Sequence, residues 1–270
     1  MPLDAYTLSP EAQERSDRAQ AALEQACLHR FGLRWPGPDE HALLAGKRLS
    51  ASRLATRFGL IDADQAEHYG YHAPPWSLHN TEFQRAMATT DRVHASGDVE
   101  KVLHGLVRDW EGSAVPEGGC RGEAFRTLAP DVKQANYRDL PRRLTAQAAK
   151  EAAGDPQVIA KSRQWASCMS RAGHRYASPT AAARDPRWAR SREPDGRETA
   201  VAEADVRCKK VAGYLATLLE TTARRQRLLI DQHSHELGLL KQYQAERAAN
   251  VNKALAARTA PSGRPRQGKG

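Results

Sequence analysis

Apolar side chains recur every three to four residues along most of the chain, and apolar–polar alternation never lasts beyond about four residues. This spacing is typical of amphipathic helices, whereas strands need longer runs of β-branched and aromatic residues. The first helix has clear boundaries, because Ser9 suits an N-cap, Pro10 a first helical position and Gly32 a C-terminal cap. We therefore expect a helix over about residues 10–31 and predict an all-α fold, a helical bundle.

Shorter helices follow in the first half of the chain. The pattern predicts them over residues 48–58, 62–69, 80–89, 98–110, 120–128 and 131–153. Pro141 would kink or restart the last of these. Gly154, Asp155 and Pro156 then stop one helix and start the next, which we expect to end at Gly173.

The region from about residue 197 to 258 predicts a very long C-terminal helix, because it lacks proline and contains only Gly213 and Gly238. Unbroken, it would measure on the order of 90 Å. Its apolar stripe is interrupted by Thr222, Gln226 and His233, so it matches a coiled coil only in part. Such an arm would pack on its own domain, on a partner, or on a second copy of the chain. Self-association through this helix is therefore one outcome that we predict.

One sequence pattern occurs twice, at residues 27–38 and 168–179. Both copies read C-x2-R-x-G-x-R-[WY]-x2-P. The shared positions suit one structural unit: a cysteine in a final helical turn, a capping glycine, an aromatic residue that folds back and an exit proline. The arginines have no evident structural need, so we treat them as candidate ligand or partner contacts: Arg30, Arg34, Arg171 and Arg175.

The chain contains four cysteines: Cys27, Cys120, Cys168 and Cys208. No C-x2-C pair is present, which argues against structural zinc. Four cysteines allow three pairings. Each copy of the repeat is followed by one further cysteine, which favours Cys27–Cys120 and Cys168–Cys208. The alternative is four buried thiols in a reduced, cytoplasmic protein.

Disulfides would imply an oxidising compartment, hence an extracytoplasmic, secreted or envelope-associated location, although no leader is visible at the start of this chain. The cysteine pairs also suggest two stapled halves, residues 1–153 and residues 154–258. Residues 259–270 form a basic tail rich in Pro, Gly and Ser that we expect to be disordered.

The net charge of +9 would attract anions such as nucleic acid, acidic wall polymers or anionic lipid. Nucleic-acid binding is one alternative function, but no recognisable binding fold supports it. Residues 197–258 also approach charge balance, with eleven basic and seven acidic side chains. No apolar run reaches the ~18 residues of a membrane span.

An aromatic loop, residues 69–76, reads Y-G-Y-H-A-P-P-W and supplies further candidate contacts: Tyr69, Tyr71, His72 and Trp76. Core packing is the simpler interpretation. His68, His72 and His79 invite a metal hypothesis, but Gly70 breaks the helical spacing and we predict no metal or cofactor.

An enzyme is the second alternative function. The chain shows no G-x-S-x-G, H-E-x-x-H, P-loop or dinucleotide fingerprint. A catalytic role for an unpaired Cys120 would need a nearby histidine that the sequence does not place. We therefore predict no catalytic residues.

Several segments together suggest a family. They are A-C-L-H-R-F-G-L-R-W-P, Y-G-Y-H, G-G-C-R-G-E-A, W-A-S-C-M-S-R-A-G-H-R-Y-A-S-P, D-P-R-W and A-D-V-R-C-K-K. Over roughly residues 20–260 the chain resembles uncharacterised exported, often lipid-anchored proteins of actinobacteria with paired cysteines. The resemblance implies export, two disulfides and an all-helical fold, but no activity. The chain departs from it in showing no lipobox cysteine.

We predict a non-enzymatic helical protein of the cell envelope that binds a partner or an anionic wall or membrane component.

Overall fold

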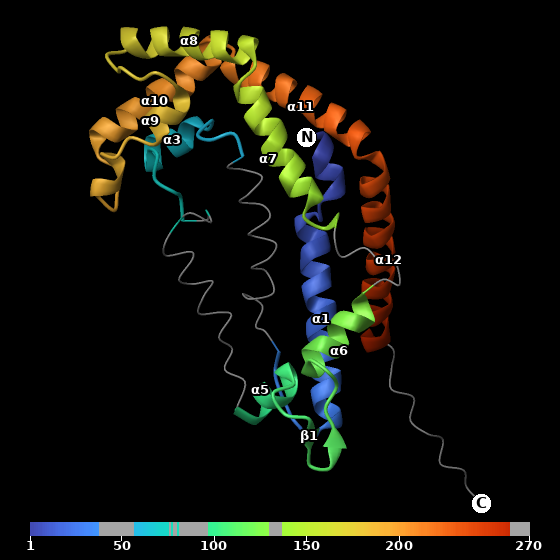
Figure 1. Cartoon of the computed structure of the whole chain (residues 1–270). Helices are drawn as coiled ribbons and strands as arrows, with labels where there is room; N and C mark the ends of the chain where they lie inside the picture. Colours follow the sequence, from blue (N-terminus) through green and yellow to red (C-terminus); the bar gives the residue numbers. More distant parts are fainter. Residues whose placement is uncertain (38–56, 76, 78–79, 81–96, 130–136, 260–270) are drawn as a thin grey trace, which may run out of the picture. The chain divides into compact units, whose positions relative to one another are not determined.

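The computed structural model describes residues 1–37, 57–75, 77, 80, 97–129 and 137–259 (Figure 1). Helices dominate these ranges. The only strands within them are β1 (Asp109–Trp110) and β2 (Ser113–Ala114), a short antiparallel pair. The predicted all-α fold class is confirmed.

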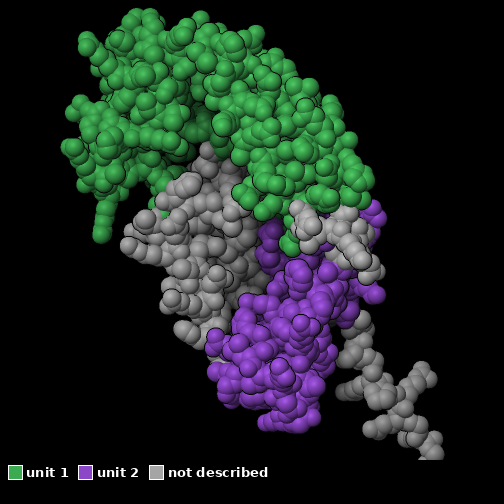
Figure 2. Space-filling view, viewed as in Figure 1, with its two compact units in different colours: residues 1–10, 48–88, 134–240 green, residues 11–47, 89–133, 241–270 purple. Residues whose placement is uncertain are grey.

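The chain forms two compact units that are interleaved in sequence (Figure 2). Unit 1 comprises residues 1–10, 48–88 and 134–240, and unit 2 comprises residues 11–47, 89–133 and 241–270. These boundaries differ from the division at residue 153 that the cysteine pairs suggest. The helix that ends there belongs to unit 1, because its apolar face packs on a helix about 80 residues later in the chain.

Unit 1 is entirely helical over its described residues. Its elements are η1 (Pro2–Tyr6), α3 (Ala63–Tyr69), α7 (Leu140–Ala153), α8 (Pro156–Arg171), α9 (Pro179–Ala183), η3 (Trp188–Arg190), α10 (Gly196–Val211), α11 (Tyr214–Gln232) and the start of α12 (Ser234–Thr259). Helix α11 packs against α7 and α8, and α10 packs against α3 and α8. Pro141 restarts the chain as α7 rather than kinking it, because it lies in the first turn.

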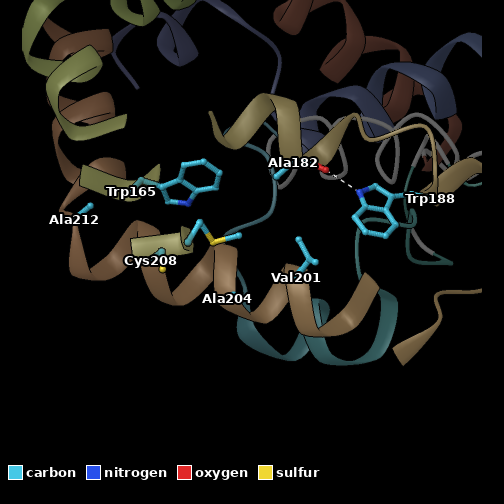
Figure 3. Packing of buried hydrophobic residues seen from close by; sticks show 8 residues of the cluster. Trp165, Ala182, Trp188, Val201, Ala204, Cys208 and Ala212 are labelled. Atoms are coloured by element: carbon cyan, nitrogen blue, oxygen red, sulfur yellow. Dashed lines mark hydrogen bonds between the residues drawn. The ribbon is translucent and has the colours of Figure 1, made fainter. Parts of the chain in front are cut away.

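Two clusters form most of the core of unit 1. One gathers Trp165, Met169, Trp188 and Cys208 between α8, η3 and α10 (Figure 3). The indole Nε1 of Trp188 donates a hydrogen bond of 2.7 Å to the carbonyl oxygen of Ala182, so its polar atom is satisfied. The other cluster joins η1, α7, α11 and the start of α12 through leucines such as Leu3 and Leu229.

Unit 2 contains most of α1 (Pro10–Arg30), α5 (Gly97–His104), the β1–β2 pair, α6 (Gly119–Leu128) and the rest of α12. Its core surrounds the Cys27–Cys120 disulfide, with Leu28, Val102 and Leu103. A smaller cluster packs Ala19 and Leu128 against the α12 side chain of Val251.

The very long C-terminal helix is not present. The region is divided into α10, α11 and α12, with breaks at Gly213 and His233. Gly213 has φ of +64°, a left-handed conformation that ends one helix and precedes the next. The prediction was wrong because it counted Gly213 as a tolerated helical residue. The continuous arm on which the self-association prediction rested is therefore absent, and self-association itself stays a prediction.

Other predicted boundaries can be compared directly. Helices α1, α3, α6 and α8 lie where the pattern places them, and Asp62 caps α3 through a 2.8 Å hydrogen bond from the Gln65 amide. Helix α7 begins at Leu140, later than the start of the helix predicted over 131–153 and at the restart that Pro141 predicts. The helix predicted over 98–110 ends at His104 instead, because Gly105 has φ of +66° and the chain turns into β1. Residues 48–56, 81–89, 131–136 and the tail 260–270 lie outside the described residues. In the ranges that the structure describes, no helix is both long and apolar enough to cross a membrane.

The sequence repeat is a helix C-terminus built twice in the same way. After α1, the Leu33 amide donates to Leu28 O and the Gly32 amide to His29 O. After α8, the equivalent bonds run from His174 to Met169 and from Gly173 to Ser170. This pair of bonds defines a Schellman cap, with glycine at the left-handed position. Gly32 has φ of +70° and Gly173 has φ of +87°, so the shared glycine has a geometric cause.

The two disulfides are Cys27–Cys120 and Cys168–Cys208, as the repeat predicts, and no cysteine is free. The paired Cα atoms are 5.5 and 5.6 Å apart, within the usual range. Trp35 and Tyr176 pack against the clusters that contain these disulfides. The half-cystine and the aromatic residue of each repeat therefore belong to one core.

Candidate ligand-binding site

A buried polar network lies on α10 in unit 1. The carboxylate of Asp205 is fully buried and accepts hydrogen bonds from Trp165 Nε1 at 2.9 Å and from the Tyr71 hydroxyl at 3.1 Å. It also accepts from Lys209 Nζ at 2.8 Å, one helical turn further on. A second bond joins the same ammonium to Leu60 O at 2.7 Å. A carboxylate with three donors is the arrangement that a buried charge requires.

The electrostatics of this network follow from its burial. Burial raises the pKa of Asp205, while the charge and hydrogen bond of Lys209 oppose that rise. Burial and the neighbouring Asp205 carboxylate raise the pKa of Tyr71, so its hydroxyl stays protonated and donates. The ammonium of Lys209 has three protons, of which two are used in the bonds above.

The loop after α3 brings its side chains to the same helix. The amide of Tyr71 donates to Glu198 Oε1 at 2.7 Å, and His72 Nδ1 lies 2.8 Å from the same oxygen. Gly70 is required here, because a Cβ would lie 2.7 Å from Glu198 Oε1 and its φ is +54°. The Tyr71 ring stacks on Trp188 with centroids 5.8 Å apart. These contacts attach the loop to the core of unit 1.

A cavity of about 390 Å³ lies beside the network, within the usual size range of small-molecule sites. Its walls come from the residues before α3, from α7, from α9 and from one face of α11. On α11 the lining residues are spaced four apart, as one helical face requires: Tyr214, Leu218, Thr222 and Gln226. On α7 they are Thr145, Ala149 and Ala153.

Burial divides the lining into a floor and a mouth. Five buried residues form the floor: Leu60, Pro179, Lys209, Thr222 and Gln226. Exposed residues form the mouth, chiefly Ala149 and Ala153 of α7 with Ala183 and Arg184 at the end of α9. The mouth is therefore edged by small side chains, including the Thr180 hydroxyl, and by one guanidinium, whereas the floor carries the polar side chains of Lys209, Thr222 and Gln226.

Gln226 is the unusual residue of this floor. Its side chain is fully buried, and its Oε1 accepts a hydrogen bond of 3.1 Å from the Leu3 amide. That donor fixes the orientation of the side-chain amide, because only the oxygen can face an N–H group. Its Nε2 then finds no hydrogen-bond partner among the described residues. Such a buried donor costs about 1–3 kcal/mol when it stays unpaired, so it calls for a ligand or water.

Cations outnumber anions around the cavity. Arg57, Arg184 and Lys209 are among the described lining residues, which include no carboxylate. Arg57 is paired with Asp4 at 2.7 Å, and Lys209 with Asp205. Neither Asp4 nor Asp205 belongs to the lining, so the charged side chains of the described lining are all cationic.

The predicted arginine contacts lie in different units and have unequal roles. Arg30 forms an ion pair of 2.6 Å with Glu123 of α6, in unit 2. In unit 1, Arg171 donates to Ser167 one turn earlier on its own helix. Arg34 and Arg175 are exposed. None of the four lines the cavity.

The predicted aromatic contacts also lie elsewhere. Tyr71 and His72 make the internal bonds described above, Tyr69 is half-buried at the end of α3, and none of these three lines the cavity. Trp76 and His79 lie outside the described residues. His68 bonds to Asp64 O at 2.8 Å. Within the described ranges no group of three or more His, Cys, Asp or Glu side chains could hold a metal ion.

Sequence reasoning missed the floor of the cavity, although a signal was present. Thr222 and Gln226 interrupt the apolar stripe of the C-terminal region. In the sequence they interrupt the stripe of a coiled coil, but in the structure they share one face of α11 that lines the cavity. No comparable signal marks Lys209 in the sequence, because two adjacent lysines are typical of a solvent-exposed helix surface.

Comparison with known proteins adds no family or relative: no family model matches the chain, and neither the curated proteins nor the solved structures include a match.

Proposed function

We propose that this chain is a non-enzymatic, extracytoplasmic binding protein of the cell envelope, and that the cavity of unit 1 is its ligand site. The observation that carries the proposal is the floor of the cavity, where Gln226 is fully buried and its Nε2 has no hydrogen-bond partner among the described residues. Lys209 belongs to the same floor. A buried donor without a partner is expensive, and a bound ligand would remove that cost.

Two further observations support this role. The disulfides favour an oxidising compartment, since such bonds rarely persist in the cytosol. All four cysteines are paired, so a thiol nucleophile is not available at Cys120 or elsewhere. The resemblance to exported actinobacterial proteins agrees with the same location.

Binding can be tested with 8-anilinonaphthalene-1-sulfonate, an apolar anion whose fluorescence rises when it leaves water. We expect saturable binding of one probe per chain. Ala149→Trp places an indole at the exposed mouth and should abolish the signal. Ala146→Trp is the matched control, because Ala146 is exposed on the same helix but does not line the cavity. Equal binding by both variants, or none by the unmodified protein, would overturn the proposed site.

The location is tested separately by peptide mapping without reducing agent on protein recovered from its native host. We expect the peptides of Cys27 and Cys120 to be linked, and likewise those of Cys168 and Cys208. Reduced cysteines in the recovered protein would contradict an extracytoplasmic location.

A further inference from the structure

The floor and the mouth of the cavity differ in chemistry, and this difference restricts the ligand. Hydrogen-bond donors lie at the buried end, where Gln226 Nε2 and Lys209 Nζ belong to floor residues. Apolar groups follow along the walls, with Phe58 and Leu218 as the larger ones. Small side chains then edge the exit, where Ala149, Ala153 and Ala183 leave room for a narrow chain.

The donors at the floor require an acceptor on the ligand. Gln226 Nε2 offers two protons, because its amide oxygen is already held by Leu3. Lys209 offers the third proton of its ammonium, which Asp205 and Leu60 leave unused. A carboxylate has two oxygens and only accepts, so its chemistry suits a floor that offers donors. A protonated amine only donates, so it would leave the donors of Gln226 and Lys209 without an acceptor.

The charges around the cavity do not oppose an anion. Asp205 neutralises Lys209, and the other two donors to Asp205, Trp165 and Tyr71, are uncharged, so the floor is neutral. Arg184 lies at the mouth, and the described lining includes no carboxylate. Hydrogen bonds in which one partner is charged are about twice as strong as neutral ones, which favours a carboxylate over an alcohol of the same length.

We propose that the cavity of unit 1 binds a monocarboxylate with a single apolar tail, head-first, with the carboxylate on Gln226 Nε2 and Lys209 Nζ and the tail directed toward the mouth. This assignment rests on the proposed function, since it names the ligand class of the same site.

The test uses octanoate, octan-1-ol and octylamine as competitors of the bound sulfonate probe, all below their aggregation concentrations. We expect octanoate to displace the probe at a concentration roughly tenfold or more below that of the other two, the difference that one charge-assisted hydrogen bond provides. Equal displacement by octan-1-ol or octylamine would overturn the assignment while the binding function stands. No displacement by any of the three would overturn it too, provided that Ala149→Trp still removes probe binding.

A substitution at the floor tests the contact itself. Gln226→Glu keeps an acceptor for the Leu3 amide but replaces the free donor with an oxygen that repels a carboxylate. We expect its affinity for octanoate to fall roughly tenfold or more, with little change for octan-1-ol. Gln226→Met removes the donor without adding charge, and serves if the first variant does not fold.

Thr221→Val is the control, because Thr221 is buried on α11 outside the lining. Unchanged preference for octanoate in a folded Gln226 variant would contradict the proposal.

Discussion

Lys209 Nζ lies 2.8 Å from Asp205 Oδ2, one turn apart on α10, and the side chains are 7% and 0% exposed. Removing one member of such a pair leaves a charge buried without its partner, which costs about 3–5 kcal/mol. We therefore expect Lys209→Met to lower the free energy of unfolding by roughly that amount, measured by urea denaturation.

Two variants control this experiment. Lys210→Met changes the neighbouring lysine, which is exposed, and should alter stability by no more than about 0.5 kcal/mol. The double variant Asp205→Asn with Lys209→Met removes both charges and should recover part of the loss. A loss in Lys209→Met as small as that in Lys210→Met would show that the pair is not buried as described.

The glycines of the sequence repeat give a second prediction. Gly32→Ala and Gly173→Ala should each destabilise by about 1–2 kcal/mol, because a non-glycine residue is unfavourable at positive φ. No heavy atom lies within 4 Å of a Cβ placed at either position, so crowding does not contribute. Asn should be tolerated better than Ala at both positions.

Gly154 provides the matched control for these caps. It follows α7, but its φ is −86°, and a Cβ there would make only ordinary contacts. Gly154→Ala should therefore be neutral or slightly stabilising. A comparison of thermal midpoints separates the cases: equal effects at all three glycines would contradict the left-handed caps.

Local features of this fold were predictable, whereas the features that depend on distant contacts were not. The Schellman caps and the Asp62 cap of α3 follow from residues within or beside each motif. The disulfide pairings are the exception, because they join distant residues but were predictable from the order of the cysteines relative to the two copies of the repeat. The break at Gly213 was misjudged, because a glycine inside a helical pattern is also compatible with a continuous helix.

The site illustrates the same limit. The floor of the cavity joins residues from four separate segments, and only the fold brings Leu60, Lys209 and Gln226 together. The interleaved units have the same origin, since α7 joins unit 1 through its packing on α11. The local sequence pattern does not determine which neighbouring helix each apolar face packs against.

The two disulfides should stabilise their units separately. Each closes a long loop, with sequence separations of 93 and 40 residues, so each should contribute about 4 kcal/mol in the chain-entropy treatment. We expect replacing Cys168 and Cys208 with Ala to accelerate hydrogen exchange mainly in unit 1. Replacing Cys27 and Cys120 should act mainly on unit 2. Mass spectrometry of exchanged peptides measures this, and a thermal midpoint unchanged by reducing agent would contradict both predictions.

The hydrogen bonds of His72 predict a pH dependence of stability. Its Nδ1 faces Glu198 Oε1 at 2.8 Å and its Nε2 faces Ser191 O at 3.1 Å. Both neighbours are acceptors, and only the protonated ring can donate from both nitrogens. Burial works against the charged ring, but the hydrogen bond to Glu198, the bond to Ser191 and the charges of Glu198 and Asp195 together raise the pKa of His72 above its ordinary value.

A raised pKa in the folded state means that the protonated ring stabilises the fold. The contribution is fully present below the pKa of the unfolded chain, about 6.5, and is lost as the pH rises through the higher pKa of the folded state. We therefore expect the stability difference between the unmodified protein and His72→Gln to be largest at about pH 6 and to shrink as the pH rises above that range. Gln keeps one donor toward Glu198 but does not titrate, so it isolates the contribution of His72. Urea denaturation across this range, with NMR titration of the ring, measures both quantities. A His72 that titrates at or below about 6.5, or a difference that does not vary with pH, would show that Glu198 does not hold the ring in its charged form.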